Sequence, residues 1–232
     1  KSTTLYAMLQ ELDRTKNNVI SLEDPVEYNI SGVNQSQVRP EIGYDFASGL
    51  RSILRQDPNI IMVGEIRDKE TAGLAINAAL TGHLVLSTLH TNSSAGVIPR
   101  LIDMGVDPYL LAPTIVLAVG QRLVGRLCPD SRDEVKVEGT IKERIEKELV
   151  NTPENIRKNI QIPAVVYQPK VSGTCPKGVS GRIVVSEALP ITREIKDAIY
   201  KNPTESAVMD VARQQGMTTL SEDALLKIFE GV

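Results

Sequence analysis

Short runs of consecutive apolar residues alternate along this chain with the spacing of amphipathic helices. The clearest run is Ile-Ile-Met-Val at residues 60–63, which no polar residue interrupts. A strand without polar alternation is buried on both faces, and such strands are typical of parallel sheets covered by helices. Similar runs occur at residues 19–22 and 84–89, each separated from the first by a helical pattern. The alternation predicts an α/β fold with a parallel sheet and helices on both faces.

The helical patterns and a change in composition predict how the rest of the chain is organised. Apolar residues at helical spacing predict helices over residues 2–16, 46–54, 68–80 and 93–104, with an extended segment at 33–38. After residue 127 the chain becomes rich in charge, then in Pro and Gly, before a strand pattern at 183–185 and helical patterns at 192–201, 204–215 and 221–230. We therefore expect a core domain at 1–127, an insertion at 128–181 and a C-terminal strand with a mostly helical subdomain at 182–232.

Charge and composition exclude several classes of partner. The chain carries 26 Lys and Arg residues against 29 Asp and Glu residues, so it has no excess positive charge to neutralise a nucleic-acid backbone. Six Tyr, two Phe and no Trp residues provide few surfaces on which bases would stack. The longest apolar stretch, residues 109–120, contains Pro113 and is shorter than the roughly 20 residues that a membrane-spanning helix needs. We expect neither nucleic-acid binding nor direct membrane insertion.

Polar residues follow each predicted strand at its carboxyl end. Glu23 follows the first strand, Glu65 follows the second and His90 follows the third. In open parallel sheets ligands bind beyond the carboxyl ends of the strands, so these side chains should meet at one edge. Lys-Ser at residues 1–2 opens a helix, and a lysine beside free backbone N–H groups suits a phosphate chain. The sequence therefore predicts a phosphate-binding site at this edge.

Three longer motifs occur in the order and at the spacing of a known family. Residues 21–28 (SLEDPVEY) resemble its Asp box, residues 59–68 (NIIMVGEIRD) its Walker B strand, and residues 81–92 (TGHLVLSTLHTN) its His box. Residues 1–2 match the end of its Walker A motif, G-x-x-x-x-G-K-[ST], whose two glycines would precede them. The chain resembles the secretion ATPase superfamily, the RecA-like hexameric motors of type II secretion and type IV pilus assembly.

The resemblance implies how the site would hold nucleotide and metal. Lys1, Ser2 and Thr3 would form the end of the Walker A motif and bind the phosphates of ATP. Ser2 and Glu23 would hold Mg²⁺, and Glu23 would also act on the attacking water. The cofactors implied are therefore ATP and Mg²⁺.

The other implied site residues would act on the reacting phosphate. Glu65 would be the catalytic carboxylate, and His90 would contact the γ-phosphate. Arg55 and Arg67 match arginines that the family places near the nucleotide or a subunit interface, and we favour that role over a solvated helix face or a local ion pair. His83 also matches the His box, but a straight strand puts it about 23 Å from His90. It would either cap a helix end or contribute to nucleotide binding.

The two cysteines, Cys128 and Cys175, depart from the family pattern. Assembly and type II secretion members often carry a tetracysteine zinc subdomain built from two C-x-x-C knuckles, whereas each apparent knuckle here keeps one cysteine. Zinc sites need four ligands and no His lies nearby, so we expect an eroded subdomain without zinc. Two cysteines are also too few for a disulfide framework. We expect two packing or vestigial cysteines in a reducing cytosol.

The function implied is that of an ATP-hydrolysing motor domain that powers assembly of a type IV pilus or a type II secretion pseudopilus. The whole protein would be a cytoplasmic homo-hexamer docked on inner-membrane platform proteins, and this chain alone would hydrolyse ATP poorly without the upstream glycines. One alternative is a retraction-type pilus ATPase, which would lack the insertion at 128–181. A RecA-like DNA translocase is disfavoured by the charge. A scaffold without turnover is disfavoured by the presence of both Glu23 and Glu65.

Overall fold

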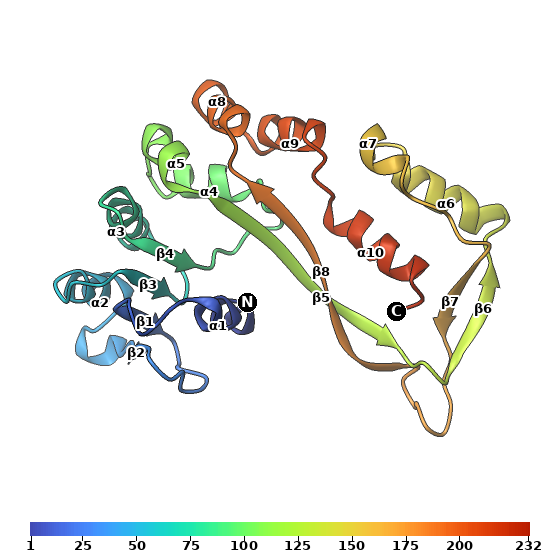
Figure 1. Ribbon diagram of the computed structural model, residues 1–232, viewed down its shortest axis with the longest axis horizontal. Helices are drawn as coiled ribbons and strands as arrows, with labels where there is room; N and C mark the ends of the chain where they lie inside the picture. The colour runs from blue at the N-terminus through green and yellow to red at the C-terminus, as the bar shows by residue number, and fades with distance from the viewer. The chain divides into compact units, whose positions relative to one another are not determined.

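The computed structural model describes residues 1–232, whose contacts divide the chain into two compact units (Figure 1). The first unit contains Lys1–Asn92, Gly96–Val116 and Ile191–Glu205, and the second contains Ser93–Ala95, Leu117–Pro190 and Ser206–Val232. These units differ from the three ranges expected from composition. The reason is that β5 (Leu117–Leu127) pairs with β8 (Val179–Pro190), so both strands belong to the second unit.

A four-stranded parallel sheet with the order β2-β1-β3-β4 forms the centre of the first unit. The parallel sheet was predicted from the sequence, whereas the strand order was not. Its strands are β1 (Val19–Glu23), β2 (Asn34–Gln37), β3 (Ile60–Val63) and β4 (Leu84–Ser87). The other elements of this unit are α1 (Ser2–Glu11), η1 (Pro40–Ile42), α2 (Phe46–Ile53), α3 (Lys69–Leu80), α4 (Val97–Asp103), α5 (Pro108–Thr114) and α8 (Arg193–Lys201). The register pairs Leu22 with Val63 and Val63 with Ser87, which brings the carboxyl ends of three strands together.

Helices cover both faces of this sheet. Successive side chains of a strand point to opposite faces, and β3 follows this rule with four buried residues. Ile60 and Met62 belong to an apolar cluster with side chains of α1. Ile61 and Val63 belong to a larger cluster with side chains of α2, α3 and α5. The apolar run at residues 60–63 therefore arises as predicted, because helices pack on both faces of this strand.

Local polar contacts set where the helices begin and end. α3 begins after Asp68, whose carboxylate accepts the Thr71 backbone N–H at 2.8 Å, and it ends before Gly82, which has a φ of 103°. α1 ends at Glu11, earlier than the predicted residue 16. The reason is a polar turn in which the Asp13 carboxylate accepts hydrogen bonds from the backbone N–H and hydroxyl of Thr15.

The second unit contains two antiparallel strand pairs, most of which the sequence did not predict. Its strands are β5 paired with β8, and β6 (Arg132–Lys136) paired with β7 (Val165–Pro169). Its helices are α6 (Gly139–Leu149), α7 (Glu154–Arg157), α9 (Glu205–Gln214) and α10 (Leu220–Phe229), of which α9 belongs to this unit from its second residue onward. α6 and α10 pack through an apolar cluster centred on Ile145, Leu149 and Leu225. None of the helices in the chain combines the length and apolar character that crossing a bilayer requires.

A disulfide joins Cys128 and Cys175, whose Cα atoms lie 6.7 Å apart. This corrects the expectation of two separate packing cysteines. Pairing of β5 with β8 brings Leu127 opposite Val179, and the two cysteines lie just beyond these strand ends. The bond therefore closes the base of the segment that carries β6, α6, α7 and β7.

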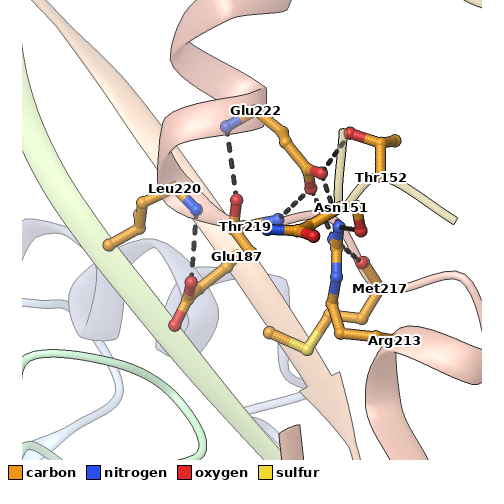
Figure 2. Close-up of polar contacts among 8 residues, drawn as sticks. All are labelled: Asn151, Thr152, Glu187, Arg213, Met217, Thr219, Leu220 and Glu222. Atoms are coloured by element: carbon orange, nitrogen blue, oxygen red, sulfur yellow. Dashed lines mark hydrogen bonds and ion pairs between the residues drawn. The ribbon is translucent and has the colours of Figure 1, made fainter. Parts of the chain in front are cut away.

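A buried ion pair joins three segments of the second unit (Figure 2). Glu222 on α10 is 3% exposed and binds the guanidinium of Arg213 on α9. The same carboxylate accepts the hydroxyl of Thr152, while Arg213 donates to the carbonyl oxygens of Asn151 and Met217 at 2.7 and 2.6 Å. Burial raises the pKa of Glu222, but the hydrogen bonds from Arg213 and Thr152 outweigh burial and lower it.

Glu187 on β8 is a second buried carboxylate of this unit, 4% exposed. Its two oxygens accept the backbone N–H groups of Ser94 at 2.5 Å and of Leu220 at 3.2 Å, the latter drawn in Figure 2. Gly120 lies opposite on β5, and a Cβ there would come within 2.8 Å of Glu187 Cγ. Glycine at this position therefore leaves room for the carboxylate.

Candidate functional site

A pocket of about 190 Å³ lies at the carboxyl ends of β1, β3 and β4. Its lining consists of Lys1, Ser2, Leu5, Glu23, Asp24, Pro25, Glu27, Phe46, Met62, Gly64, Glu65, Thr88 and His90. Five of the predicted site residues are among them: Lys1, Ser2, Glu23, Glu65 and His90. They come from the start of α1 and from the segments that follow three neighbouring strands, which is the arrangement that the sequence predicted.

Four predicted residues do not line this pocket: Thr3, Arg55, Arg67 and His83. Thr3 is exposed on α1, and Arg55 is exposed just after α2. His83 lies at the amino end of β4 and lines a separate pocket of about 500 Å³ with Asn59. Its Nδ1 is 2.8 Å from the carbonyl oxygen of Ala78, and because a carbonyl only accepts, Nδ1 carries the proton and donates. His83 therefore caps the end of α3, one of the two roles expected for it.

Glu23 is held by three side-chain donors in a nearly closed environment. It is 3% exposed, and its Oε1 accepts Ser21 Oγ at 2.5 Å and Gln35 Nε2 at 3.0 Å. Its Oε2 accepts the hydroxyl of Tyr6. Burial and then the bond to Glu23 raise the pKa of Tyr6 to about 12. Each carboxylate oxygen has two lone pairs, so one lone pair of Oε2 remains for a further ligand.

These three donors were not predicted from the sequence. Ser21 precedes Glu23 by two residues on β1, so strand periodicity alone places both side chains on one face. The position of Ser21 beside Glu23 was therefore predictable from the strand pattern. Tyr6 and Gln35 reach Glu23 from α1 and β2, and only the folded arrangement brings them there.

Glu65 is held between two cationic or proton-donating side chains. Its side chain is 14% exposed, forms an ion pair with Arg67, and accepts His90 Nε2 at 3.1 Å. Burial raises the pKa of Glu65, but the hydrogen bonds from Arg67 and His90 outweigh it and hold that pKa below its ordinary value. Glu65 is therefore ionised at neutral pH. Arg67, for which the sequence favoured a site role over a local ion pair, forms its ion pair with Glu65.

Backbone contacts fix the strand ends that carry these side chains. The Gly64 N–H donates to the Leu22 carbonyl at 2.8 Å, and Thr88 Oγ1 donates to the Gly64 carbonyl at 2.8 Å. A Cβ on Gly64 would approach the Leu22 oxygen to 3.2 Å, so glycine permits this close contact between β1 and the end of β3. The backbone segments that carry Glu23 and Glu65 are therefore hydrogen-bonded directly to each other.

The donor chemistry of Ser2 and Glu23 fits a magnesium ion bound together with phosphate. Hydroxyl and carboxylate oxygens are the hard ligands that Mg²⁺ prefers, and it commonly takes one or two carboxylates together with phosphate oxygens and water. No group of three or more His, Cys, Asp or Glu side chains in the chain is arranged to hold a metal ion by itself. Lys1 Nζ donates to the Leu89 carbonyl at 2.6 Å, so a cationic group lies next to His90.

All 232 residues match the family model described as "Type II/IV secretion system protein". Type II secretion system protein E of Xanthomonas campestris is 44% identical over 231 residues, which are 100% of this chain and 39% of that protein. The type IV pilus assembly ATPase PilB of Thermus thermophilus is 41% identical over 239 residues, which cover 100% of this chain and 25% of that protein. This chain thus spans less than half the length of either relative.

Two solved structures are similar in fold. The ATPase DotB of Legionella pneumophila superposes with a TM-score of 0.67 and 26% identity, covering 100% of this chain and 54% of that one. The pilus retraction motor PilT with bound ADP gives a TM-score of 0.59 and 28% identity, covering 96% of this chain and 56% of that one. The RecA-like α/β fold expected from the motifs is confirmed.

Proposed function

Because this chain belongs to the type II/IV secretion system protein family, we propose that it is the ATP-hydrolysing part of a motor that assembles a type IV pilus or a type II secretion pseudopilus. The proposal rests mainly on one observation: a single pocket is lined by Lys1, Ser2, Glu23, Glu65 and His90. The names of two relatives, a type II secretion protein E and a pilus assembly ATPase, support it.

In this proposal the start of α1 binds the phosphate chain of ATP. The ammonium of Lys1 pairs with the β- and γ-phosphates, and the free backbone N–H groups at the helix start favour the same negative charge. Ser2 and Glu23 hold Mg²⁺, with Glu23 acting through the remaining lone pair of Oε2. When bound, the metal would supply positive charge that offsets the negative charge developing on the phosphate in the transition state.

Glu65 is proposed to align the attacking water. A carboxylate with a lowered pKa is a weak base in the ground state, so Glu65 first orients the water and accepts its proton only as positive charge develops on that oxygen in the transition state. His90 and Arg67, which both contact Glu65, act on the γ-phosphate, where positive charge stabilises the transition state. Arg55 is exposed outside the pocket, so its proposed place is the contact with another copy of the chain.

Three substitutions in the full-length protein separate these roles. Glu65→Gln should keep nucleotide affinity and lower turnover by about 10²- to 10⁴-fold, because the amide cannot accept a proton or stabilise positive charge on the water. Lys1→Ala should lower affinity and turnover together. Glu23→Gln should fall between them and recover partly with added Mg²⁺. The exposed Glu41→Gln is the matched control.

Steady-state ATP hydrolysis and nucleotide affinity are the measurements for these variants. Turnover close to that of the unchanged protein in Glu65→Gln would remove Glu65 from the mechanism and leave Glu23 as the base. This 232-residue chain alone is proposed to hydrolyse ATP poorly, since Lys1 and Ser2 alone of its residues correspond to the phosphate-binding pattern G-x-x-x-x-G-K-[ST].

The proposed assembly is a cytoplasmic homo-hexamer held at the inner membrane by platform proteins of the pilus or secretion machine. A retraction motor is the second candidate, because the PilT chain superposes over 96% of this one. The 41% identity to the assembly ATPase PilB over the whole chain favours an assembly motor, since the identity to PilT is 28%. Deleting the gene separates the two, since loss of an assembly motor abolishes filaments or secretion, whereas loss of a retraction motor leaves filaments in place.

A further inference from the structure

The hydroxyl of Tyr6 makes two contacts behind the pocket. It donates to Glu23 Oε2 and accepts the backbone N–H of Glu27 at 3.1 Å. Tyr6 is fully buried and does not line the pocket, whereas Glu23 and Glu27 both line it. One hydroxyl on α1 therefore contacts the last residue of β1 and the loop that follows this strand.

The loop after β1 depends on a second polar side chain that also contacts Glu23. Gln35 on β2 donates to Glu23 Oε1 and to the Tyr28 carbonyl at 3.2 Å, and its own Oε1 accepts the Ile30 N–H at 2.6 Å. The rings of Tyr6 and Tyr28 also pack edge to face with centroids 4.6 Å apart. The Glu23 carboxylate and the loop at 24–33 are thus held by Tyr6 from one side and by Gln35 from the other.

α1 begins at the residues proposed to bind phosphate. Tyr6 follows Ser2, the first residue of α1, by about one helical turn. A helix is stiff over this length, so Tyr6 and the phosphate-binding end of α1 move together. A change in the position of Tyr6 relative to Glu23 would therefore change the distance between the bound phosphates and this carboxylate.

We propose that Tyr6 is a positioning residue, whose hydroxyl holds Glu23 and the loop at 24–33 in the single arrangement in which both line the pocket. The proposal rests on the proposed ATPase function, in which Glu23 acts on the metal and the attacking water. Tyr6 itself touches neither nucleotide nor water and acts through Glu23 and Glu27.

Tyr6→Phe tests the proposal because it keeps the ring and removes only the hydroxyl. In the full-length protein we expect kcat to fall about tenfold or more, the cost of one hydrogen bond to a charged group. The KM for ATP should change less than about twofold, because Lys1 and Ser2 keep their positions. In the nucleotide-free 232-residue chain, amide hydrogen exchange at Glu27 should become about fivefold faster, since its N–H loses its acceptor.

Two matched variants distinguish positioning from a general effect on stability. Tyr28→Phe makes the same chemical change on the ring that packs against Tyr6. The Tyr28 residue is 49% exposed and its hydroxyl contacts neither Glu23 nor Glu27, so kcat and exchange should stay at the unchanged values. Ser21→Ala removes a different donor from Glu23 and leaves the contact to Glu27 intact, so kcat should fall while exchange at Glu27 stays the same.

Unchanged kcat in Tyr6→Phe, or unchanged exchange at Glu27, overturns the proposal. Absence of ATP hydrolysis by the unmodified full-length protein instead refutes the proposed function, and exchange at Glu27 then still decides whether Tyr6 holds the loop. If thermal unfolding shows that Tyr6→Phe does not fold, the exchange rate of the Glu27 amide in the unmodified chain tests the proposal instead. A Glu27 amide that exchanges as fast as an unstructured peptide overturns the proposal, and a protected amide supports it.

Discussion

Removing the guanidinium of Arg213 should destabilise the second unit more than removing any exposed cation. Glu222 is 3% exposed, and in Arg213→Leu its carboxylate would stay buried without a cation, while the Asn151 and Met217 carbonyls would lose their donor. Breaking a buried pair in this way costs about 3–5 kcal/mol, because an uncompensated charge remains in a low-dielectric environment. We expect the free energy of unfolding of this unit to fall by that amount.

An exposed pair in the same unit provides the matched control. Lys158 lies 2.8 Å from Glu154 one turn away on the same short helical segment, and their side chains are 70% and 81% exposed. Exposed pairs at this spacing contribute about 0.3–0.5 kcal/mol. Lys158→Leu should therefore change the free energy of unfolding by less than about 1 kcal/mol, although the change in chemistry is similar to that in Arg213→Leu.

The effect should depend on pH with a defined sign. Because the pKa of Glu222 is lowered in the folded chain, its stabilising contribution is present above the unfolded value of about 4.3 and is lost as the pH falls through the lower folded value. The difference in the free energy of unfolding between Arg213→Leu and the unchanged chain should therefore become smaller from pH 7 to about pH 3.5. At the lower pH the unpaired Glu222 carboxyl of the variant takes up a proton and is no longer a buried charge.

Urea unfolding followed by circular dichroism, with amide exchange of α10 to localise the change, measures both effects. The reasoning is refuted if Arg213→Leu costs no more than Lys158→Leu at pH 7. A difference that stays constant between the two pH values would mean that Glu222 is not the group responsible.

Two further predictions concern the cysteines. The disulfide closes a loop with a sequence separation of 47, so its reduction, or Cys128→Ser, should lower the free energy of unfolding by about 4 kcal/mol, and an unchanged urea midpoint after reduction would contradict this. We also expect no stoichiometric zinc, since a disulfide leaves no thiolate for the metal; one zinc per chain, lost in Cys175→Ser, would show that other ligands complete a site.

The first unit was predictable where burial leaves a pattern in the sequence. Ile60–Val63 is apolar throughout because helices cover both of its faces, and the strand has the bounds that the pattern indicated. β5 gave no such signal, because most of its residues are exposed, including Leu123 at 55%, and its partner β8 lies far along the chain. A strand held by a distant partner rather than by a buried face cannot be located from periodicity.

The same distinction applies to the site. Glu23, Glu65 and His90 were predictable because parallel strands bring their carboxyl ends to one edge, a rule that needs only local patterns. Tyr6 and Gln35 could not be predicted as site residues, because their contacts with Glu23 depend on how α1 and β2 lie relative to β1. Nothing in the spacing of either residue indicates that its side chain ends on a carboxylate.

The pairing of Cys128 with Cys175 also makes the segment between them a separable module. The two ends of the segment, Cys128 and Cys175, lie close together, with a Cα–Cα distance of 6.7 Å. A linker of about two residues could span this distance in place of the segment. Residues can therefore be added or removed between the cysteines without altering the register of β5 and β8. The limit on such changes is the apolar contact of Ile145 and Leu149 with Leu225, which any shorter module would have to replace to keep α10 covered.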